Sequence, residues 1–310
     1  MREVRYLSPT SVKKYLTDRE QFFIDYMADE REDRMPQTQA MSVGSAFDAY
    51  VKAYLYKELA CGSDAAFELA TLLETQVEPH NLDFAREAGR KCFDAYKGFG
   101  CIADLMLMLT AGTNPRFEFT LEGSIDPVTM KLGDSGVTLL GKPDMHFINK
   151  DGCGVILDWK VNGYCSKRKP SPTRGYLNMV PQGKSHKDAI PGYINGVLCN
   201  IACYLDTGSE DWGRQLAIYG WLMGEAVGSE FITGIDQLVC CNGTIHGVAQ
   251  HRSRINPAYQ HALFDNVCDI WKRTREGGHF FDDMSYTDSI ERCKVLNGSF
   301  GEPMDFRREL

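Results

Sequence analysis

The chain has 310 residues, of which 43% are hydrophobic and 25% charged, a composition typical of a folded globular protein with a sizeable core. Its formal net charge of −8 argues against a surface uniformly covered with cations for nucleic acid. No apolar run is long enough to span a membrane (about 18 residues) and the N-terminus lacks an apolar signal region, so we expect a cytoplasmic protein with no membrane partner and reduced cysteines.

The first third of the chain is predicted to be mainly helical. Ser8 or Thr10 would cap the first helix, and Pro9 fits its first turn. Asp48 would lie near the first turn of the second helix, where the helix dipole favours a carboxylate. The predicted helices cover residues 8–28, 43–60, 64–76 and 82–112.

Strands are predicted next. The segment Arg116–Glu122 alternates between polar and apolar residues, so Glu118 and Glu122 would share one face of a strand. An exposed acidic face is the simplest interpretation of that pattern. The predicted strands cover residues 116–122, 125–131, 137–148 and 153–161.

The most informative segment runs from residue 139 to residue 160. Alternation places Asp158 and Lys160 on one face of a strand and Trp159 on the other. The turn-forming segment Asn149–Gly154 predicts a hairpin that brings Asp144 near Asp158 and Lys160. Two carboxylates and an ammonium group on a rigid sheet suit a divalent cation and an anionic substrate.

A simpler interpretation of Asp158 and Lys160 is a solvated charge pair on an exposed strand. The four residues before Asp158, 154–157, have the composition of a buried strand. Acids are rarely placed beside a buried strand without a partner or a metal, so we favour a functional role.

Residues 163–190 are predicted to form a loop, because Pro and Gly interrupt any helix or strand there. We expect this basic loop to clamp a DNA backbone, since each cation placed on a phosphate releases counterions. Tyr164 and Tyr176 could stack on unpaired bases. A surface insertion without a ligand is the alternative. The loop has one acid and six cations: Lys167, Arg168, Lys169, Arg174, Lys184 and Lys187.

The C-terminal part is predicted to contain a helix over 210–228, a hairpin and a last helix over 257–276. Gln215 and Tyr219 are four residues apart and therefore share one face of the first of these helices, although a buried Tyr is often only part of the core. Asn242-Gly243 is a strong turn signal between strands at 234–241 and 244–252.

These motifs resemble the PD-(D/E)xK nuclease superfamily, in particular its RecB-like exonuclease branch. That branch has Gly-x-x-Asp, then Asp-x-Lys on the next strand, then Gln-x-x-x-Tyr on a helix. This chain has Gly141-Lys-Pro-Asp144, Asp158-Trp-Lys160 and Gln215-Leu-Ala-Ile-Tyr219 in that order. An opening Ser8-Pro-Thr-Ser-Val12 followed by aromatic residues also matches, and the similarity extends thinly from residue 6 to about residue 225.

The resemblance implies an α/β fold in which a central mixed β-sheet is flanked by helices, a restriction-endonuclease-like core with a helical N-terminal region. We expect one domain over residues 1–310. Within it, residues 1–112 would be mainly helical and 113–255 would form the catalytic core. Residues 256–310 would form the C-terminal helix and tail.

The resemblance also implies a metal-dependent DNA nuclease, an exonuclease of recombination or repair such as a phage encodes. Mg²⁺ or Mn²⁺ would be held by Asp144, Asp158 and the carbonyl of Trp159, and Asp48 and Glu118 are further candidate ligands. Asp48 stands where the branch usually has His, and an oxygen ligand suits these cations. The residues expected in the catalytic set are Asp144, Asp158, Lys160, Gln215 and Tyr219.

Single- or double-stranded DNA is the expected substrate, with a recombination or repair protein as a candidate partner. No iron–sulfur cluster is expected, because only Cys268 and Cys293 stand in the tail where some relatives have three cysteines. Two alternatives stay open: a catalytically inactive nuclease-fold protein that binds DNA or assists assembly, and a metal-independent enzyme whose acids are merely surface charges.

Overall fold

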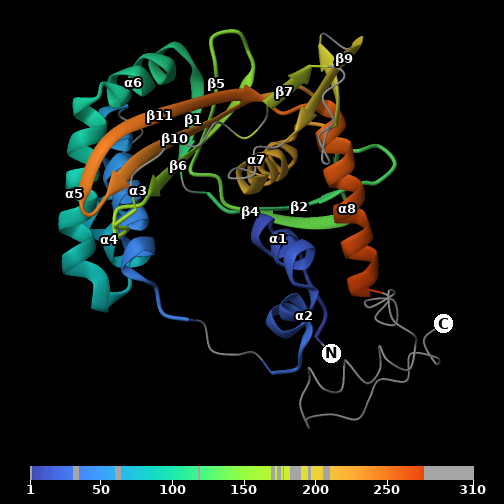
Figure 1. Ribbon diagram of the computed structural model, residues 1–310, viewed down its shortest axis with the longest axis horizontal. Helices are drawn as coiled ribbons and strands as arrows, with labels where there is room; N and C mark the ends of the chain where they lie inside the picture. The colour runs from blue at the N-terminus through green and yellow to red at the C-terminus, as the bar shows by residue number, and fades with distance from the viewer. Residues whose placement is uncertain are drawn as a thin grey trace.

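The computed structural model describes residues 2–30, 35–59, 64–117, 119–168, 172, 176, 178–181, 190–194, 197–204 and 210–275. A five-stranded sheet lies at the centre of the described chain (Figure 1), with the strand order β1-β5-β6-β10-β11. β6 and β10 run parallel, and the other neighbours are antiparallel. The strands are β1 (Thr113–Phe117), β5 (Met145–Ile148), β6 (Gly154–Asn162), β10 (Ile232–Cys241) and β11 (Thr244–Arg254).

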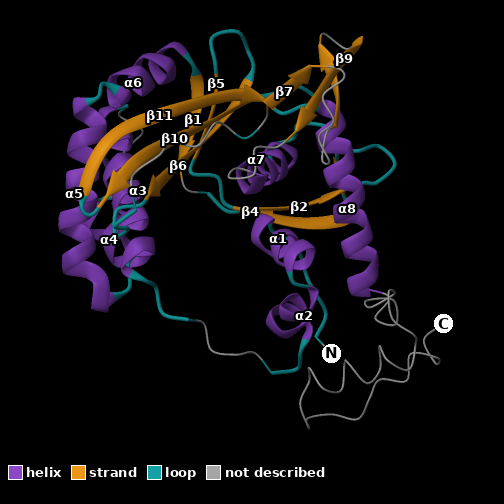
Figure 2. Ribbon diagram, viewed as in Figure 1, coloured by secondary structure: helices purple, strands orange, loops and turns teal. Residues whose placement is uncertain are grey.

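Helices α3 to α6 cover one face of this sheet, as Figure 2 shows. Val155, Leu157 and Trp159 of β6 are buried in one hydrophobic cluster with Phe47 and Val51. Burying such apolar side chains contributes roughly 1.5–3 kcal/mol each. The helices of this layer are α3 (Gln39–Glu58), α4 (Leu69–Gln76), α5 (Leu82–Gly98) and α6 (Cys101–Ala111).

Helix α7 (Glu210–Leu222) covers the opposite face of the sheet. Ile156 of β6 and Ile235 of β10 share a buried cluster with Leu216 of α7. The other side of α7 contacts a small sheet of order β3-β2-β4, so the helix is enclosed between two sheets. The small sheet consists of β2 (Leu121–Ile125), β3 (Leu132–Gly133) and β4 (Val137–Gly141), and α1 (Pro9–Thr17), α2 (Arg19–Phe22) and α8 (Pro257–Arg275) complete this side.

Gly220 lets α7 approach the residues behind it. A Cβ atom at this position would lie 2.1 Å from Cζ of Phe231, whose ring is fully buried. We therefore expect Gly220→Ala to lower the free energy of unfolding by about 1–3 kcal/mol, the usual cost of overpacking a core. Urea denaturation would measure this change. Gly98→Ala is the matched control, because its Cβ would meet no atom within 4 Å; equal stabilities of the two variants would contradict the packing argument.

The predicted fold class is confirmed: a mixed sheet flanked by helices, with a helical N-terminal region. The predicted hairpin around Asn242-Gly243 is also confirmed, since both residues have positive φ angles and join β10 to β11. The last predicted helix is present as α8.

Several predicted helix boundaries were wrong. The helix expected over 8–28 ends at Thr17, because the extended Asp18 caps α2, which continues into a π-helical turn, Phe23–Met27. A left-handed Gly100 (φ 84°) divides the helix expected over 82–112 into α5 and α6. Gly224 (φ 100°) likewise follows the end of α7 at Leu222, before the predicted residue 228.

Three predicted strands were also wrong. Pro143 divides the strand expected over 137–148, because it cannot donate to a ladder, so β4 and β5 belong to different sheets. The strand expected over 116–122 is likewise divided in two. β1 pairs with β5, and β2 pairs with β4. Residues 126–129 form a turn in which the Asp126 carboxylate accepts from two backbone N–H groups, so β2 ends at Ile125 and no strand continues over 126–131.

The sequence predicted a loop over residues 163–190, but this segment contains a strand, so the prediction was partly wrong. β7 (Asn178–Pro181) lies within residues 163–190 and forms a third sheet of order β7-β9-β8 with β8 (Ile190–Ile194) and β9 (Val197–Tyr204). Pro181 and Pro191 stand on the outer strands of this sheet, where a missing N–H is tolerated.

Within the described parts of the chain, none of the helices combines the length and the apolar character needed to cross a bilayer.

Candidate functional site

The predicted hairpin of β5 and β6 exists and places Asp144 opposite Asp158. Met145 pairs with Leu157, so the preceding residue, Asp144, faces the next one, Asp158. The Trp159 backbone N–H donates to Asp144 Oδ2 over 3.1 Å, and Lys160 Nζ forms an ion pair with Asp158 Oδ2. The Asp158 side chain is only 1% exposed, which excludes the interpretation of a solvated surface pair.

Helix α7 adds an amide and a phenol to this face. Gln215 Nε2 donates to Asp158 Oδ1 over 3.1 Å and to the Tyr219 hydroxyl over 3.0 Å. The two side chains share one helix face, as their spacing predicted. Gly141 allows the approach, because a Cβ there would lie 2.8 Å from the Tyr219 ring.

Helix α3 contributes Asp48 and also Lys52, which the sequence analysis missed. Lys52 Nζ lies 2.5 Å from Asp48 Oδ2 and 3.6 Å from Asp144 Oδ1, and its side chain is 2% exposed. The spacing Asp48-x-x-x-Lys52 is the sequence signal that could have identified it. Asp48 lies in the middle of α3, not near its first turn, because Thr38 caps the helix before Gln39.

The two sheet carboxylates differ in their proton affinity. Burial and the neighbouring Asp144 carboxylate raise the pKa of Asp158 well above its usual range, against the effect of Lys160. Burial also acts to raise the pKa of Asp144, but Lys52 and Lys160 outweigh it and hold that pKa below its ordinary value. Two close carboxylates with divergent pKa values are typical of a site that shares a proton or binds a cation.

Lys160 and Tyr219 keep their protons at neutral pH. Burial acts to lower the pKa of Lys160, but Asp158 and Asp144 outweigh it and raise that pKa above its usual value. Burial, together with the charges of Asp158 and Asp144, raises the pKa of Tyr219. Lys160 therefore carries a positive charge, and Tyr219 is a neutral phenol whose hydroxyl accepts from the Gln215 amide.

The oxygen donors at this site fit a hard cation. Asp144 and Asp158 supply carboxylates, the ligands that Mg²⁺ and Mn²⁺ prefer. The Asp144 charge adds to burial in raising the pKa of Asp158, and a bound cation would relieve this repulsion between the two carboxylates. Among the residues that the structure describes, no three His, Cys, Asp or Glu side chains are grouped as a metal site.

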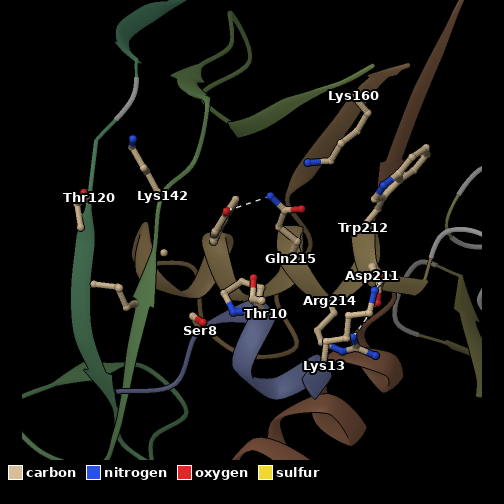
Figure 3. Close-up of a pocket in the computed structure, with 14 residues that line it drawn as sticks. Ser8, Thr10, Lys13, Thr120, Lys142, Lys160, Asp211, Trp212, Arg214 and Gln215 are labelled. Carbon is tan, nitrogen blue, oxygen red and sulfur yellow. Dashed lines mark hydrogen bonds and ion pairs between the residues drawn. The ribbon is translucent and has the colours of Figure 1, made fainter. Parts of the chain in front are cut away.

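The site opens into two cavities. One, of about 370 Å³, is lined by Asp48, Lys52, Asp144, Asp158 and Lys160. The other, of about 610 Å³, shares Lys142, Lys160, Gln215 and Tyr219 with it and continues past Trp212 to the start of α1. Figure 3 shows Lys142 and Lys160 on opposite sides of this larger cavity, with Gln215 between them.

A buried polar network supports the other side of β6. Trp159 Nε1 donates to the Tyr96 hydroxyl over 3.2 Å, and Tyr96 donates to Asp236 Oδ2. Arg252 Nη1 donates to Asp236 Oδ1 over 2.6 Å. This network fixes the indole on the face opposite Asp158, as strand alternation predicted.

Four of the other predicted site residues lie within the described part of the chain, and five lie outside it. Lys167 and Arg168 are exposed, whereas Glu118, Lys169, Arg174, Lys184 and Lys187 lie outside the described residues. Tyr164 and Tyr176 are 8% and 1% exposed. Tyr176 shares a 2.7 Å hydrogen bond with Thr233 Oγ1, and Tyr164 contacts Phe84 edge-on. The prediction that these two rings stack on unpaired bases was therefore wrong, since both are part of the core.

Comparison with known proteins does not identify a family. No family model matches the chain, and no curated protein matches it. A solved structure described as "Crystal structure of SSO0001" is similar to this chain at 14% sequence identity and a TM-score of 0.26. The alignment covers 84% of this chain and 84% of the chain in that structure. A TM-score of this size carries no argument, so the interpretation of the site depends on its own geometry.

Proposed function

We propose that this protein is a metal-dependent DNA nuclease that hydrolyses phosphodiester bonds, acting as an exonuclease in recombination or repair. The observation that carries the proposal is the convergence of Asp144, Asp158 and Lys160 on one cavity wall beside Gln215. The order of these residues resembles the motifs of the RecB-like branch of the PD-(D/E)xK nucleases. We propose membership of that branch on the same grounds.

Asp144, Asp158 and the Trp159 carbonyl would hold Mg²⁺ or Mn²⁺. When bound, the cation would lower the pKa of a water molecule and offset charge on the scissile phosphate. Gln215 orients Asp158 through its 3.1 Å hydrogen bond, and Tyr219 in turn fixes the Gln215 amide. The chain thus holds the acceptor carboxylate in one orientation before the substrate arrives.

Lys160 has an electrostatic role in this proposal. Its raised pKa keeps the ammonium protonated at neutral pH, which disfavours proton abstraction by this residue. A fixed positive charge beside the cavity stabilises the charge that develops on the phosphoryl oxygens. The larger cavity offers room for the nucleotides next to the scissile bond, with Lys142 on one side.

The test of the proposal is hydrolysis of end-labelled single- and double-stranded DNA in Mg²⁺, Mn²⁺ or EDTA. We expect cutting in either metal, none in EDTA, and none by Asp144→Asn. Asp151→Asn, an exposed acid in the turn between β5 and β6, is the matched control and should cut like the wild type. Cutting that persists in EDTA would refute the proposal, and the sizes of early products separate exonuclease from endonuclease action.

The basic loop supports a second, separable contact with DNA. Changing Lys167, Arg168 and Lys169 together to Gln should weaken DNA binding and reduce the slope of log K against log salt by about 2 to 3. Fluorescence anisotropy in EDTA, across about 50–200 mM salt, would measure it. The control changes Lys57, Lys131 and Lys150 to Gln. An unchanged slope in the loop variant would remove the clamp from the proposal.

The alternative is a nuclease-fold DNA-binding or assembly protein that does not cut. The replacement of the usual His by Asp48, which forms an ion pair with Lys52, is the observation that favours it. Tight DNA binding without hydrolysis in Mg²⁺ or Mn²⁺ would support this alternative.

A further inference from the structure

The buried ammonium group of Lys52 lies between two carboxylates, those of Asp48 and Asp144. It lies 2.5 Å from Asp48 Oδ2 and 3.6 Å from Asp144 Oδ1, and Lys52 is part of the wall of the smaller cavity. Its side chain is 2% exposed, while those of Asp48 and Asp144 are 15% and 22% exposed. The ammonium therefore lies deeper than the carboxylates that it joins.

The fold holds this ammonium in place. Lys52 is one helical turn after Asp48 on α3, and α3 packs against α5 and β6. The neighbouring Val51 and Leu55 are fully buried, which fixes the rotation of the helix. A buried charge is stable only while it is paired, so Lys52 stays with Asp48 and Asp144.

The charges of the site are consistent with one additional divalent cation. With all five groups ionised, Asp48, Asp144 and Asp158 carry three negative charges, and Lys52 and Lys160 carry two positive charges. One divalent cation and one phosphodiester would bring the sum to zero. A second divalent cation would leave two uncompensated positive charges in a largely buried site, which is costly.

We propose that the Lys52 ammonium occupies the cation position between Asp48 and Asp144, so that the site binds a single divalent cation, at Asp144 and Asp158. Asp48 is then a positioning residue for Lys52 instead of a metal ligand. This inference rests on the proposed metal-dependent nuclease, and it specifies how many metal ions that nuclease uses.

The number of Mn²⁺ ions bound per chain tests this inference without any nuclease assay. Isothermal titration calorimetry of the full chain with Mn²⁺ alone should give one ion for the wild type. Lys52→Met has nearly the same length without the charge, and it should bind two ions. The double variant Asp48→Asn with Lys52→Met should return to one ion, and Lys57→Met, an exposed lysine on the same helix, should stay at one.

Two results would overturn the inference: two Mn²⁺ ions on the wild type, or one ion on a folded Lys52→Met. If Lys52→Met does not fold, Lys52→Gln, which keeps a donor beside Asp48, replaces it and should bind two ions. Circular dichroism reports folding in each case. Failure of the proposed function has a different result, namely a wild type that binds no Mn²⁺.

Discussion

Asp158→Asn should abolish metal-dependent hydrolysis, by about 10³-fold or more, and should stabilise the metal-free protein. The variant loses a metal ligand but retains the acceptor of the Gln215 hydrogen bond, so the local packing is preserved. It also removes a buried negative charge that burial and Asp144 disfavour by more than the ion pair with Lys160 favours it. We therefore expect the free energy of unfolding and the Tm, both measured in EDTA, to rise.

The stability difference should depend on pH with a definite sign. The pKa of Asp158 is raised in the folded protein, so binding of its proton stabilises the folded state. This contribution to the free energy of unfolding is fully present below about pH 4, the pKa of an aspartate in the unfolded chain. That stability is lost as the pH rises through the folded-state pKa. The asparagine variant has no such loss, so its advantage should grow as the pH rises above about 4. Urea denaturation in EDTA at several pH values measures it, and an advantage that shrinks with rising pH would contradict the electrostatic account.

Lys160→Met should lower hydrolysis by about 10²–10³-fold without weakening Mn²⁺ binding. The ammonium stabilises charge on the phosphate but competes with a cation for the Asp158 carboxylate, with which it forms an ion pair. Its removal should therefore leave the Kd for Mn²⁺ unchanged or lower. Single-turnover kinetics and calorimetry would give the two quantities.

Lys150→Met is the matched control for Lys160, because Lys150 is an exposed lysine in the turn of the same hairpin. It should change neither the rate nor the Kd. If Lys160→Met instead loses Mn²⁺ binding in proportion to activity, Lys160 holds the metal site together and has no separate role at the phosphate.

Local patterns in the sequence determined the part of the site that lies on one hairpin. The alternation in Val155–Lys160 and the turn at Asn149–Gly154 predicted that Asp144, Asp158 and Lys160 meet, and the structure brings them together. The spacing of Gln215 and Tyr219 likewise predicted one shared helix face. These features depend only on the periods of strands and helices, which are intrinsic to the backbone.

Tertiary structure decided which partners these residues have. Lys52 reaches Asp144 because α3 packs across β6, a contact between segments about a hundred residues apart that no local pattern records. Packing also placed Tyr164 and Tyr176 in the core, although they belong to a basic segment that looked exposed. Pro143 divides β4 from β5, but the strand partners available on either side decided that the two halves joined different sheets.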